Sequence, residues 1–402
     1  MESHTLIKDP LYGFVQVTDP LIKSVIEHPY FQRLRRIKQM GMADFVFPGA
    51  THTRFQHSIG SMYLAQKAIN TLKRKNIPIS KSEQQGLQLA ALLHDIGHGP
   101  FSHSSETLFF PKTSHESITY QVVELLNQEY GGELTIALSI LKGDYPKKYL
   151  NQLIVSQIDL DRLDFLNRDR YFTGVSGVNF DVDRIIEMLD IFENNLVYDF
   201  KSLHTLEKFL FDRRFMKLQV YGHKNNILAD LLLEKMWTRF KQVELNTKFL
   251  LPKFSFWFSQ TNKLNDSQIS QQMVHEFLKL DDSDMIQLWK LGKAHPDKTL
   301  QLLCNSLLDR KFPKIQLSQS HPFDKVIDKY KSQLEAWQQD KELSSYFVFA
   351  GHVKSLTYSP RKDKVLVKLK KDESKPLHEL VKYLKSYYFS EDLRIHYICH
   401  QK

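Results

Sequence analysis

Apolar residues recur at helical spacing along most of the chain. From Arg54 to about Lys75 they fall three or four positions apart, as on one face of an amphipathic helix. Ser82 and Gln85 form a capping box at the start of a second long helix. The same tests predict helices at 20–40 (two, divided at Pro29), 115–130, 147–170, 181–195, 202–218, 223–243 and 265–310.

Strand-like patterns are confined to the two ends of the chain. Residues 6–17, which contain Pro10 and Gly13, suggest a short hairpin. The last part of the chain predicts strands at 344–353, 364–369 and 393–398, with a helix at 376–389. We therefore predict a mainly α fold, with a helical core over 1–340 and a small α+β C-terminal unit over 341–402.

The second long helix ends in residues that do not suit an apolar interior. Its run of Leu and Ala leads directly into His94 and Asp95. Buried Asp and His side chains need compensation, and a divalent metal supplies it. Adjacent helix residues point about 100° apart, so both reach one ion only near a helix end, which Gly97 and Gly99 provide. An imidazole with a carboxylate suits Mn²⁺, Fe²⁺, Zn²⁺ or Ni²⁺ better than Ca²⁺.

Composition places the chain among soluble globular proteins. It has 402 residues, 42% of them hydrophobic and 25% charged, and its formal charge of +9 favours anionic ligands such as nucleotides or nucleic acid. We see no N-terminal signal and no apolar run of about 18 residues, and therefore expect no membrane span. Cys304 and Cys399 are the only cysteines, which fits a cytoplasmic location and excludes a cysteine-based zinc site.

Several motifs resemble a known family. His57, the adjacent His94-Asp95 and Asp161 are similar to the H…HD…D signature of HD-domain phosphohydrolases. Longer stretches resemble the deoxynucleoside triphosphate (dNTP) triphosphohydrolases, namely the vertebrate sterile-alpha-motif and HD-domain dNTPase and its bacterial relatives: Asp9-Pro10-Leu-Tyr-Gly13, Phe31-Gln-Arg-Leu-Arg35, Arg54-Phe-Gln-His57, Leu93-His-Asp-Ile-Gly-His98 and Asp159-Leu-Asp-Arg-Leu-Asp-Phe165. The resemblance covers about residues 6–230 and implies a multi-helix HD-domain bundle, with the HD motif proper at about 50–175 and no sterile-alpha-motif domain ahead of it.

The resemblance implies a role for each residue of the site. One divalent transition metal would be held by His57, His94, Asp95 and Asp161, with Mg²⁺ arriving on the nucleotide. His98 and His115 would lie beside the α-phosphate, and His115 would act as the acid or activate the nucleophile. His103 and Glu106 would support them, although a helix-capping role for His103 stays open and relatives commonly have Asp at position 106.

The resemblance also implies a nucleotide site. The phosphate clamp would be Arg54, Arg162 and Arg213, the sugar would meet Asp169, Tyr221 and Phe165 (usually Tyr in the family), and Gln39 and Met40 would lie beside the sugar and base. On an ideal helix Phe165, Asp169 and Arg162 lie within about 100° of Asp161, which supports one shared face. For Asp164 and Arg168 a solvent-exposed charged face fits as well as any role. No dedicated polar group reads the base, so we expect mixed dNTP use.

Regulation is implied at a second set of positions. Glu27, Arg35, His223 and Lys224 match an activator site for GTP or a dNTP at subunit interfaces, and ordinary interface charges are the alternative. The resemblance implies a homo-oligomer, either a dimer or a tetramer.

Three functions are weighed from these residues. The first is metal-dependent hydrolysis of dNTPs to deoxynucleoside and inorganic triphosphate. The second keeps the metal site but acts as a phosphohydrolase or phosphodiesterase on another nucleotide or on nucleic-acid ends. The third is a catalytically weak nucleotide-sensing or nucleic-acid-binding regulator. Arg54, Asp169, Arg213 and Tyr221 favour the first, because a generic HD phosphatase needs none of them.

Overall fold

The fold was analysed in a computed structural model of the chain. It describes residues 5–243, 252–260, 269–318, 323–338, 341–355, 364–370, 373–381 and 393–400. Within these residues no helix has both the length and the apolar character needed to cross a membrane.

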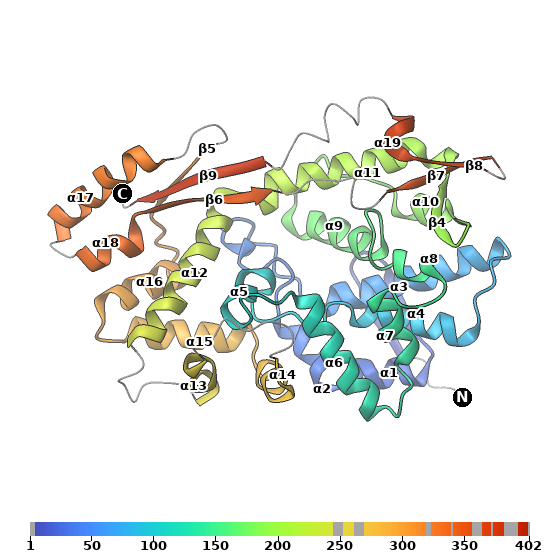
Figure 1. The fold of residues 1–402 in the computed structure, drawn as a ribbon, viewed down its shortest axis with the longest axis horizontal. Coiled ribbons are helices and arrows are strands. Elements are labelled where there is room, and N and C mark those ends of the chain that lie inside the picture. The colour runs from blue at the N-terminus through green and yellow to red at the C-terminus, as the bar shows by residue number, and fades with distance from the viewer. Residues whose placement is uncertain are drawn as a thin grey trace.

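Helices make up most of the described chain, which confirms the expected mainly α fold (Figure 1). They are α1 (Pro20–Glu27), α2 (Pro29–Gln32), α3 (Arg54–Arg74), α4 (Lys81–Leu93), α5 (Glu106–Phe109), α6 (His115–Glu129), α7 (Thr135–Lys142), α8 (Lys148–Gln152), α9 (Leu160–Thr173), α10 (Val182–Glu187), α11 (Leu203–Met216), α12 (Lys224–Val243), α13 (Pro252–Ser259), α14 (Gln271–Phe277), α15 (Asp282–Lys293), α16 (Lys298–Leu308), α17 (Asp324–Gln338), α18 (Lys341–Phe347) and α19 (Leu377–Leu380). A π-helical turn, Lys217–Tyr221, continues α11.

The strands form three small sheets at the edges of the helical body. They are β1 (Thr5–Asp9), β2 (Gly13–Val17), β3 (Leu189–Phe192), β4 (Asn195–Asp199), β5 (Lys314–Ser318), β6 (Phe349–Ser355), β7 (Leu366–Lys370), β8 (Glu373–Pro376) and β9 (Leu393–His400). Strands β1 and β2 form the expected N-terminal hairpin. The other sheets have the orders β3-β4-β7-β8 and β5-β9-β6. In the first, β7 runs parallel to β4, and in the second β9 is antiparallel to both neighbours.

Helix α3 is the centre of the helical body. It packs against α4 and α9, and buries apolar side chains such as Leu64, Ala68 and Leu72 along its length. Helix α4 packs on its other side against α7, where Gly86 lies directly against Ile136. Side chains at the starts of α3 and α9 and at the end of α4 are therefore fixed relative to one another by a continuous apolar core.

Two expected helices begin or break elsewhere. The capping box of α4 is formed by Ser80 and Glu83, not by Ser82 and Gln85: Ser80 N–H donates to Glu83 Oε2 over 2.7 Å, and Glu83 N–H donates to Ser80 Oγ. The helix expected over 147–170 is divided into α8 and α9. Asp159 starts α9 as its N-cap by accepting a hydrogen bond from Arg162 N–H at 2.7 Å.

The prediction of a helix over 181–195 is wrong after Glu187, where α10 ends. Strands β3 and β4 follow it, joined by a turn in which Glu193 and Asn194 have φ values of 47° and 61°. Left-handed backbone at both central positions suits a two-residue hairpin, and Asn tolerates it better than most residues.

The C-terminal strands are present at 366–370 and 393–400, close to their expected positions. The strand expected over 344–353 begins only at Phe349, because residues 341–347 form α18. Of the helix expected over 376–389, Leu377–Leu380 is helical, and residues 382–389 lie outside the described part of the chain. The division of the chain at residue 340 stays a prediction.

Replacing Gly86 tests the close packing of α4 on α7. Alanine is the better helix former by about 1 kcal/mol, so an isolated helix would gain stability from Gly86→Ala. The new Cβ would lie 2.9 Å from Ile136 Cβ and still closer to its Cγ2, and overpacking costs roughly 1–3 kcal/mol. We expect a lower free energy of unfolding by denaturant titration, and a smaller penalty when Gly86→Ala is made in an Ile136→Ala background. A gain in stability would contradict the packing.

Candidate metal centre and active site

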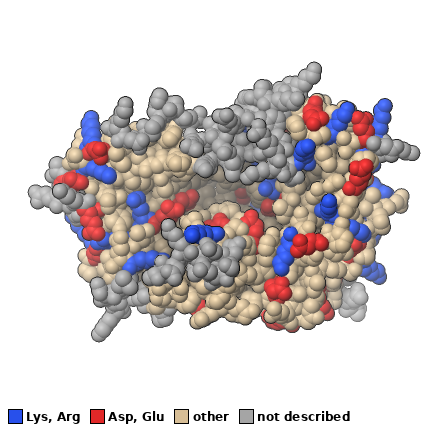
Figure 2. Space-filling model, viewed as in Figure 1, with Lys and Arg blue, Asp and Glu red and all other residues tan. Residues whose placement is uncertain are grey.

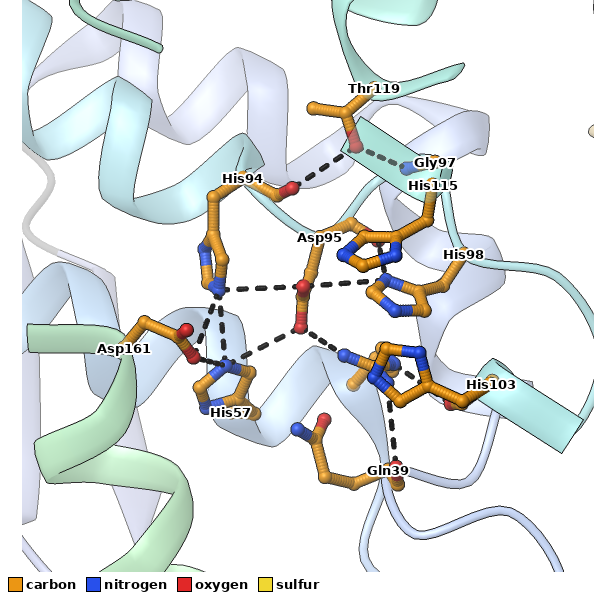
Figure 3. Close-up of polar contacts among 12 residues, drawn as sticks. Gln39, His57, His94, Asp95, Gly97, His98, His103, His115, Thr119 and Asp161 are labelled. Carbon is orange, nitrogen blue, oxygen red and sulfur yellow. Dashed lines mark hydrogen bonds and ion pairs between the residues drawn. The ribbon is translucent and has the colours of Figure 1, made fainter. Parts of the chain in front are cut away.

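Four side chains from three helices converge on one point (Figure 3). His57 lies in the first turns of α3, and Asp161 lies in the first turn of α9. His94 is the C-cap of α4 and is followed directly by Asp95. The end of α4 thus allows two adjacent residues to face the same point, as the sequence analysis expected.

The facing atoms of these side chains are spaced for one ion. His57 Nε2 is 3.1 Å from both His94 Nε2 and Asp161 Oδ1, and His94 Nε2 is 3.4 Å from Asp161 Oδ1. Asp95 adds Oδ2 at 3.4 Å from His57 Nε2 and Oδ1 at 3.5 Å from His94 Nε2. Ligand atoms about 2.1 Å from one ion are separated by about 3.0–3.4 Å at tetrahedral or octahedral corners.

The two imidazole rings are oriented as metal ligands. His57 Nδ1 is 2.8 Å from Asp164 Oδ2, and His94 Nδ1 is 2.8 Å from the carbonyl oxygen of Ala91. Both partners accept hydrogen bonds, so Nδ1 of each ring carries a proton and Nε2 faces the cluster. With a cation bound, these two Nε2 atoms, which lie 3.1 Å apart, would supply the lone pairs that hold it.

Carboxylates outnumber guanidinium groups around this cluster. Asp164 and Arg168 are fully buried, so the solvent-exposed face that fitted them in the sequence is wrong. Direct ion pairs around His57 join four carboxylates and two guanidinium groups: Asp9, Asp95, Asp161, Asp164, Arg54 and Arg168. Two negative charges are left over, which one divalent cation would balance.

These carboxylates favour positive charge on the two rings. Burial lowers the pKa of His57, but its hydrogen bonds to Asp161 and Asp164 raise the pKa to about 10. Burial likewise lowers the pKa of His94, but the charge of Asp95 together with the hydrogen bond and charge of Asp161 raises it overall. Burial raises the pKa of Asp161, whereas hydrogen bonds from His57 and His94 hold it well below its usual range. The donor set of two imidazoles and two carboxylates fits a divalent transition metal.

Three more histidines lie on the other side of Asp95 (Figure 3). His98, His103 and His115 bring ring nitrogens within 4.8 Å of one another, and the rings of His98 and His115 stack with centroids 4.0 Å apart. Burial, followed by the charge of Arg54, lowers the pKa of His98 well below its ordinary value, so this ring is neutral.

Glu106 anchors two of these rings. Its Oε1 lies 3.1 Å from His115 Nδ1 and accepts the backbone N–H of His115 at 2.8 Å, while its Oε2 lies 3.1 Å from His103 Nδ1. Burial raises the pKa of Glu106, but the hydrogen bonds from His103 and His115 hold it well below the usual range. The ionised carboxylate accepts Nδ1–H of His115, so proton exchange falls to Nε2, which lies 3.5 Å from Glu116 Oε1.

One cavity of about 490 Å³, a volume typical of small-molecule sites, is lined by Asp95 and Asp161 of the first cluster and by all three histidines of the second. Figure 2 shows that the face viewed is hollowed near its middle. Among the residues expected to bind metal or substrate or to act in catalysis, the lining includes Gln39, Met40, Arg54, Asp95, His98, His103, His115, Asp161, Arg162, Phe165, Asp169, Arg213 and Tyr221.

The three arginines expected to clamp phosphate all reach this cavity. Arg54 Nη1 is ion-paired with Asp95, and its Nε donates to Ser102 Oγ at 2.8 Å. Arg162 is ion-paired with Asp159, the N-cap of its own helix. Arg213 donates to Gln157 Oε1 at 2.9 Å, and burial beside Arg162 lowers its pKa to about 10. Closely spaced cations in a partly buried wall favour a polyanionic ligand.

Asp169, which also lines the cavity, is the centre of a hydrogen-bond triad. Its Oδ2 accepts the Tyr221 hydroxyl at 2.5 Å, and its Oδ1 lies 2.7 Å from His52 Nε2. The His52 ring is fully buried and stacks on Phe172 with centroids 4.6 Å apart. No specific role for His52 was expected from the sequence, although six of the 17 histidines lie between positions 52 and 115.

Five polar residues in the lining were not singled out from the sequence: Ser102, Ser104, Glu116, Asn226 and Asp230. Ser104 lies beside the histidine cluster, and Asn226 and Asp230 come from one face of α12. Burial raises the pKa of Asp230 to about 7. Asn226 and Asp230 lie one helical turn apart, and polar residues have the same spacing on a cavity wall and on a solvent-exposed surface. The sequence pattern alone could therefore not identify them as lining residues.

In the part of the chain that the structure describes, no hydrogen bond or ion pair joins the positions expected to bind an activator to one another. Glu27 is exposed near the end of α1, and Arg35 lies over the Phe55 ring at 3.6 Å. His223 and Lys224 lie at the start of α12. Among the described residues, none of these four belongs to the cavity lining, so an activator site stays a prediction.

Two stretches of the chain match known families. Residues 54–167 match the HD domain, and residues 180–251 match the HD-associated region. The match to the HD domain includes the histidines and aspartates of the metal cluster.

Similar proteins cover much of the same chain. It is 32% identical over 318 residues to the uncharacterized protein YwfO of Bacillus subtilis, covering 77% of this chain and 71% of YwfO. It is 30% identical over 260 residues to a deoxynucleoside triphosphate triphosphohydrolase SAMHD1 homolog of Dictyostelium discoideum, covering 60% of this chain but only 50% of that protein. A crystal structure of a phosphohydrolase from Bacteroides thetaiotaomicron has a TM-score of 0.94 at 34% identity, with both chains covered in full.

Metal addition should raise the unfolding temperature of the purified protein. A ligand that binds only the folded state at 100 times its Kd adds about 2.7 kcal/mol, so Mn²⁺ should give a clear shift in a thermal melt after chelation. Asp161→Asn should lose most of this shift because it removes a charged oxygen from the cluster. Glu187→Gln, which alters an exposed ion pair with Arg74, is the matched control. Equal Mn²⁺ shifts in all three proteins would rule out the assigned ligand set.

Proposed function

We propose a substrate and a reaction for this chain, which belongs to the HD-domain phosphohydrolases with an HD-associated region. The reaction is hydrolysis of a dNTP to deoxynucleoside and inorganic triphosphate. Water adds to the α-phosphorus, the bond from that phosphorus to the 5′ oxygen breaks, and the departing oxygen takes a proton. The metal-dependent reaction therefore needs a phosphate clamp, a proton donor and a means of recognising the sugar.

One observation carries this proposal. A single cavity is lined by Asp95 and Asp161 of the metal cluster, by the three arginines and by the Asp169–Tyr221 pair, and it therefore offers a place for phosphate and for sugar at once. A general phosphatase needs only the place for phosphate. The Dictyostelium relative, whose match covers 60% of this chain, is named for the same activity.

The phosphate end of the substrate would lie between the metal and the arginines. A bound divalent ion supplies Lewis-acid chemistry at a phosphoryl group. Arg54, Arg162 and Arg213 would neutralise and orient the phosphate chain, and their planar guanidinium groups suit paired oxygen contacts. Fixed cations that meet the charge on the oxygens of the reacting phosphate lower the barrier without rearranging during the reaction.

The proton for the departing oxygen would come from His115. Glu106 fixes Nδ1 of this ring, so Nε2 is the nitrogen that exchanges a proton. His98 is neutral and stacked on His115, which keeps the acid's neighbour uncharged. His103 would support the pair through its contact with the other oxygen of Glu106.

The sugar would lie against Asp169, Tyr221 and Phe165. Asp169 would accept the 3′ hydroxyl, and the Tyr221 ring would pack where a ribose carries its 2′ hydroxyl. Gln39 and Met40 would lie beside the base, and Met40 adapts to bases of different shape. We therefore propose that the protein uses the dNTPs broadly, with Mg²⁺ bound to the nucleotide.

We also propose that the protein is a cytoplasmic homo-oligomer. GTP or a dNTP would activate it by binding at Glu27, Arg35, His223 and Lys224.

The products of the reaction test the proposal directly. Purified protein with Mn²⁺ and each of the four dNTPs should release inorganic triphosphate and deoxynucleoside, separated by anion-exchange chromatography. His115→Ala should lower kcat by about 10²–10⁴ because a general acid is lost. His204→Ala is the control, since that histidine is exposed on α11. Release of nucleoside monophosphate with pyrophosphate would replace this reaction with cleavage at a different bond.

Substitution of Tyr221 tests sugar recognition. Tyr221→Ala should lower the ratio of kcat/KM for a dNTP to that for the matching NTP by about tenfold or more, because an apolar wall rejects an added hydroxyl by up to about 100-fold. Tyr221→Phe keeps the ring and should retain most of the ratio, even if loss of the contact with Asp169 lowers the rate. An unchanged ratio in Tyr221→Ala would contradict the assigned role.

A further inference from the structure

We propose that Asp9 and Arg168 are positioning residues for the metal centre, and that the N-terminal hairpin β1–β2 is part of its support. The inference rests on the metal site of the proposed function and is independent of the substrate. It concerns how the His57 ring is held and uses contacts outside the cavity.

The first step joins His57 to Arg168. Nδ1–H of His57 donates to Asp164 Oδ2 over 2.8 Å. Arg168 grips the same carboxylate with two donors: Nε is 2.8 Å from Oδ2, and Nη2 is 2.9 Å from Oδ1. A two-point contact fixes the plane of the Asp164 carboxylate, and through it the direction of the His57 ring.

The second step joins Arg168 to the hairpin. Its Nη1 donates to Asp9 Oδ2 over 2.8 Å. The other oxygen of Asp9 accepts the backbone N–H groups of Leu11 and Tyr12 at 2.9 and 3.2 Å, in the turn between β1 and β2. An unbroken set of hydrogen bonds therefore runs from the hairpin turn to the imidazole ring.

Burial removes water as an alternative hydrogen-bond partner for these charged groups. The side chains of His57, Asp164 and Arg168 have no exposed area, and that of Asp9 is 3% exposed. Charges without water depend wholly on their protein partners. Gly60 makes the space: it lies one turn beyond His57 on α3, and a Cβ there would collide with Asp164 Oδ1 and Arg168 Nη2.

The charge of the network bears on the metal rather than on folding alone. Two carboxylates and one guanidinium leave one negative charge behind Nδ1–H of His57. Negative charge on the far side of a ligating imidazole fixes its tautomer and makes its Nε2 a stronger donor. A purely structural salt bridge would stabilise the fold without changing the affinity or geometry of the metal.

Asp9→Asn in the full chain separates these two roles. The asparagine oxygen still accepts the turn N–H groups of Leu11 and Tyr12, while the charge facing Arg168 is removed. Arg168→Lys keeps the charge but loses the two-point grip. Asp297→Asn is the matched control, because it breaks a partly buried ion pair with Arg239 between α12 and α16.

Three measurements are made on each protein: Mn²⁺ affinity by competition with a chelator, the visible absorption spectrum with Co²⁺, and the unfolding temperature without metal. We expect Asp9→Asn and Arg168→Lys to bind Mn²⁺ about tenfold more weakly, the lower end of the usual loss for groups behind a ligand. The Co²⁺ spectrum should change in both variants and should not change in Asp297→Asn.

Parental Mn²⁺ affinity and a parental Co²⁺ spectrum in Asp9→Asn would overturn the inference, whatever happens to its unfolding temperature. If Arg168→Lys does not fold, Asp9→Asn decides alone. If the parent protein binds neither Mn²⁺ nor Co²⁺, the metal site of the proposed function fails together with this inference. Parental binding with altered variants supports the inference even if dNTPs prove not to be substrates.

Discussion

Negative charge gathered inside an apolar helical body is the constraint on which this structure depends. Asp95, Asp161 and Asp164 meet around His57, where water cannot screen them. Such charges are tolerated only when each has a partner. Arg54 forms an ion pair with Asp95 on the cavity side, and Arg168 forms one with Asp164 on the hairpin side. The packing of α3 against α4 and α9 holds the cavity side and the hairpin side at fixed distances. The negative charge that these arginines leave unbalanced is therefore concentrated at the metal cluster.

Asp95 connects the two functional halves of the site. Its Oδ2 faces His57, while its Oδ1 lies 3.5 Å from His94 Nε2 and 3.3 Å from His98 Nδ1. One carboxylate thus belongs both to the candidate metal ligands and to the wall that carries His98 and His115. The division of labour follows from protonation: ionised Glu106 controls the tautomer of one ring, and burial keeps its stacked neighbour neutral. Geometry and proton state are set by the same few groups.

Local signals in the sequence predicted the elements that carry the site. Apolar spacing located α3, and the change from a Leu-rich run to His94-Asp95 located the end of α4. Long-range pairing was beyond reach. Asp164 and Arg168 look like surface residues because charge normally means exposure, and only the fold brings Asp9 to them. His52 has no flanking motif, and its link to Asp169 joins positions 117 residues apart. The roles of the site residues rest on resemblance and remain proposals.

The order of strands in the sheet β5-β9-β6 has a consequence for biosynthesis. The strand made after its two neighbours is the one that lies between them. Until β9 leaves the ribosome, β5 and β6 have no shared partner, and each presents unpaired backbone groups that invite pairing with other chains. The helices around the metal cluster lie earlier in the chain and can pack first. We therefore expect this sheet to form after the helical body, and its unpaired strands to be open to aggregation until it does.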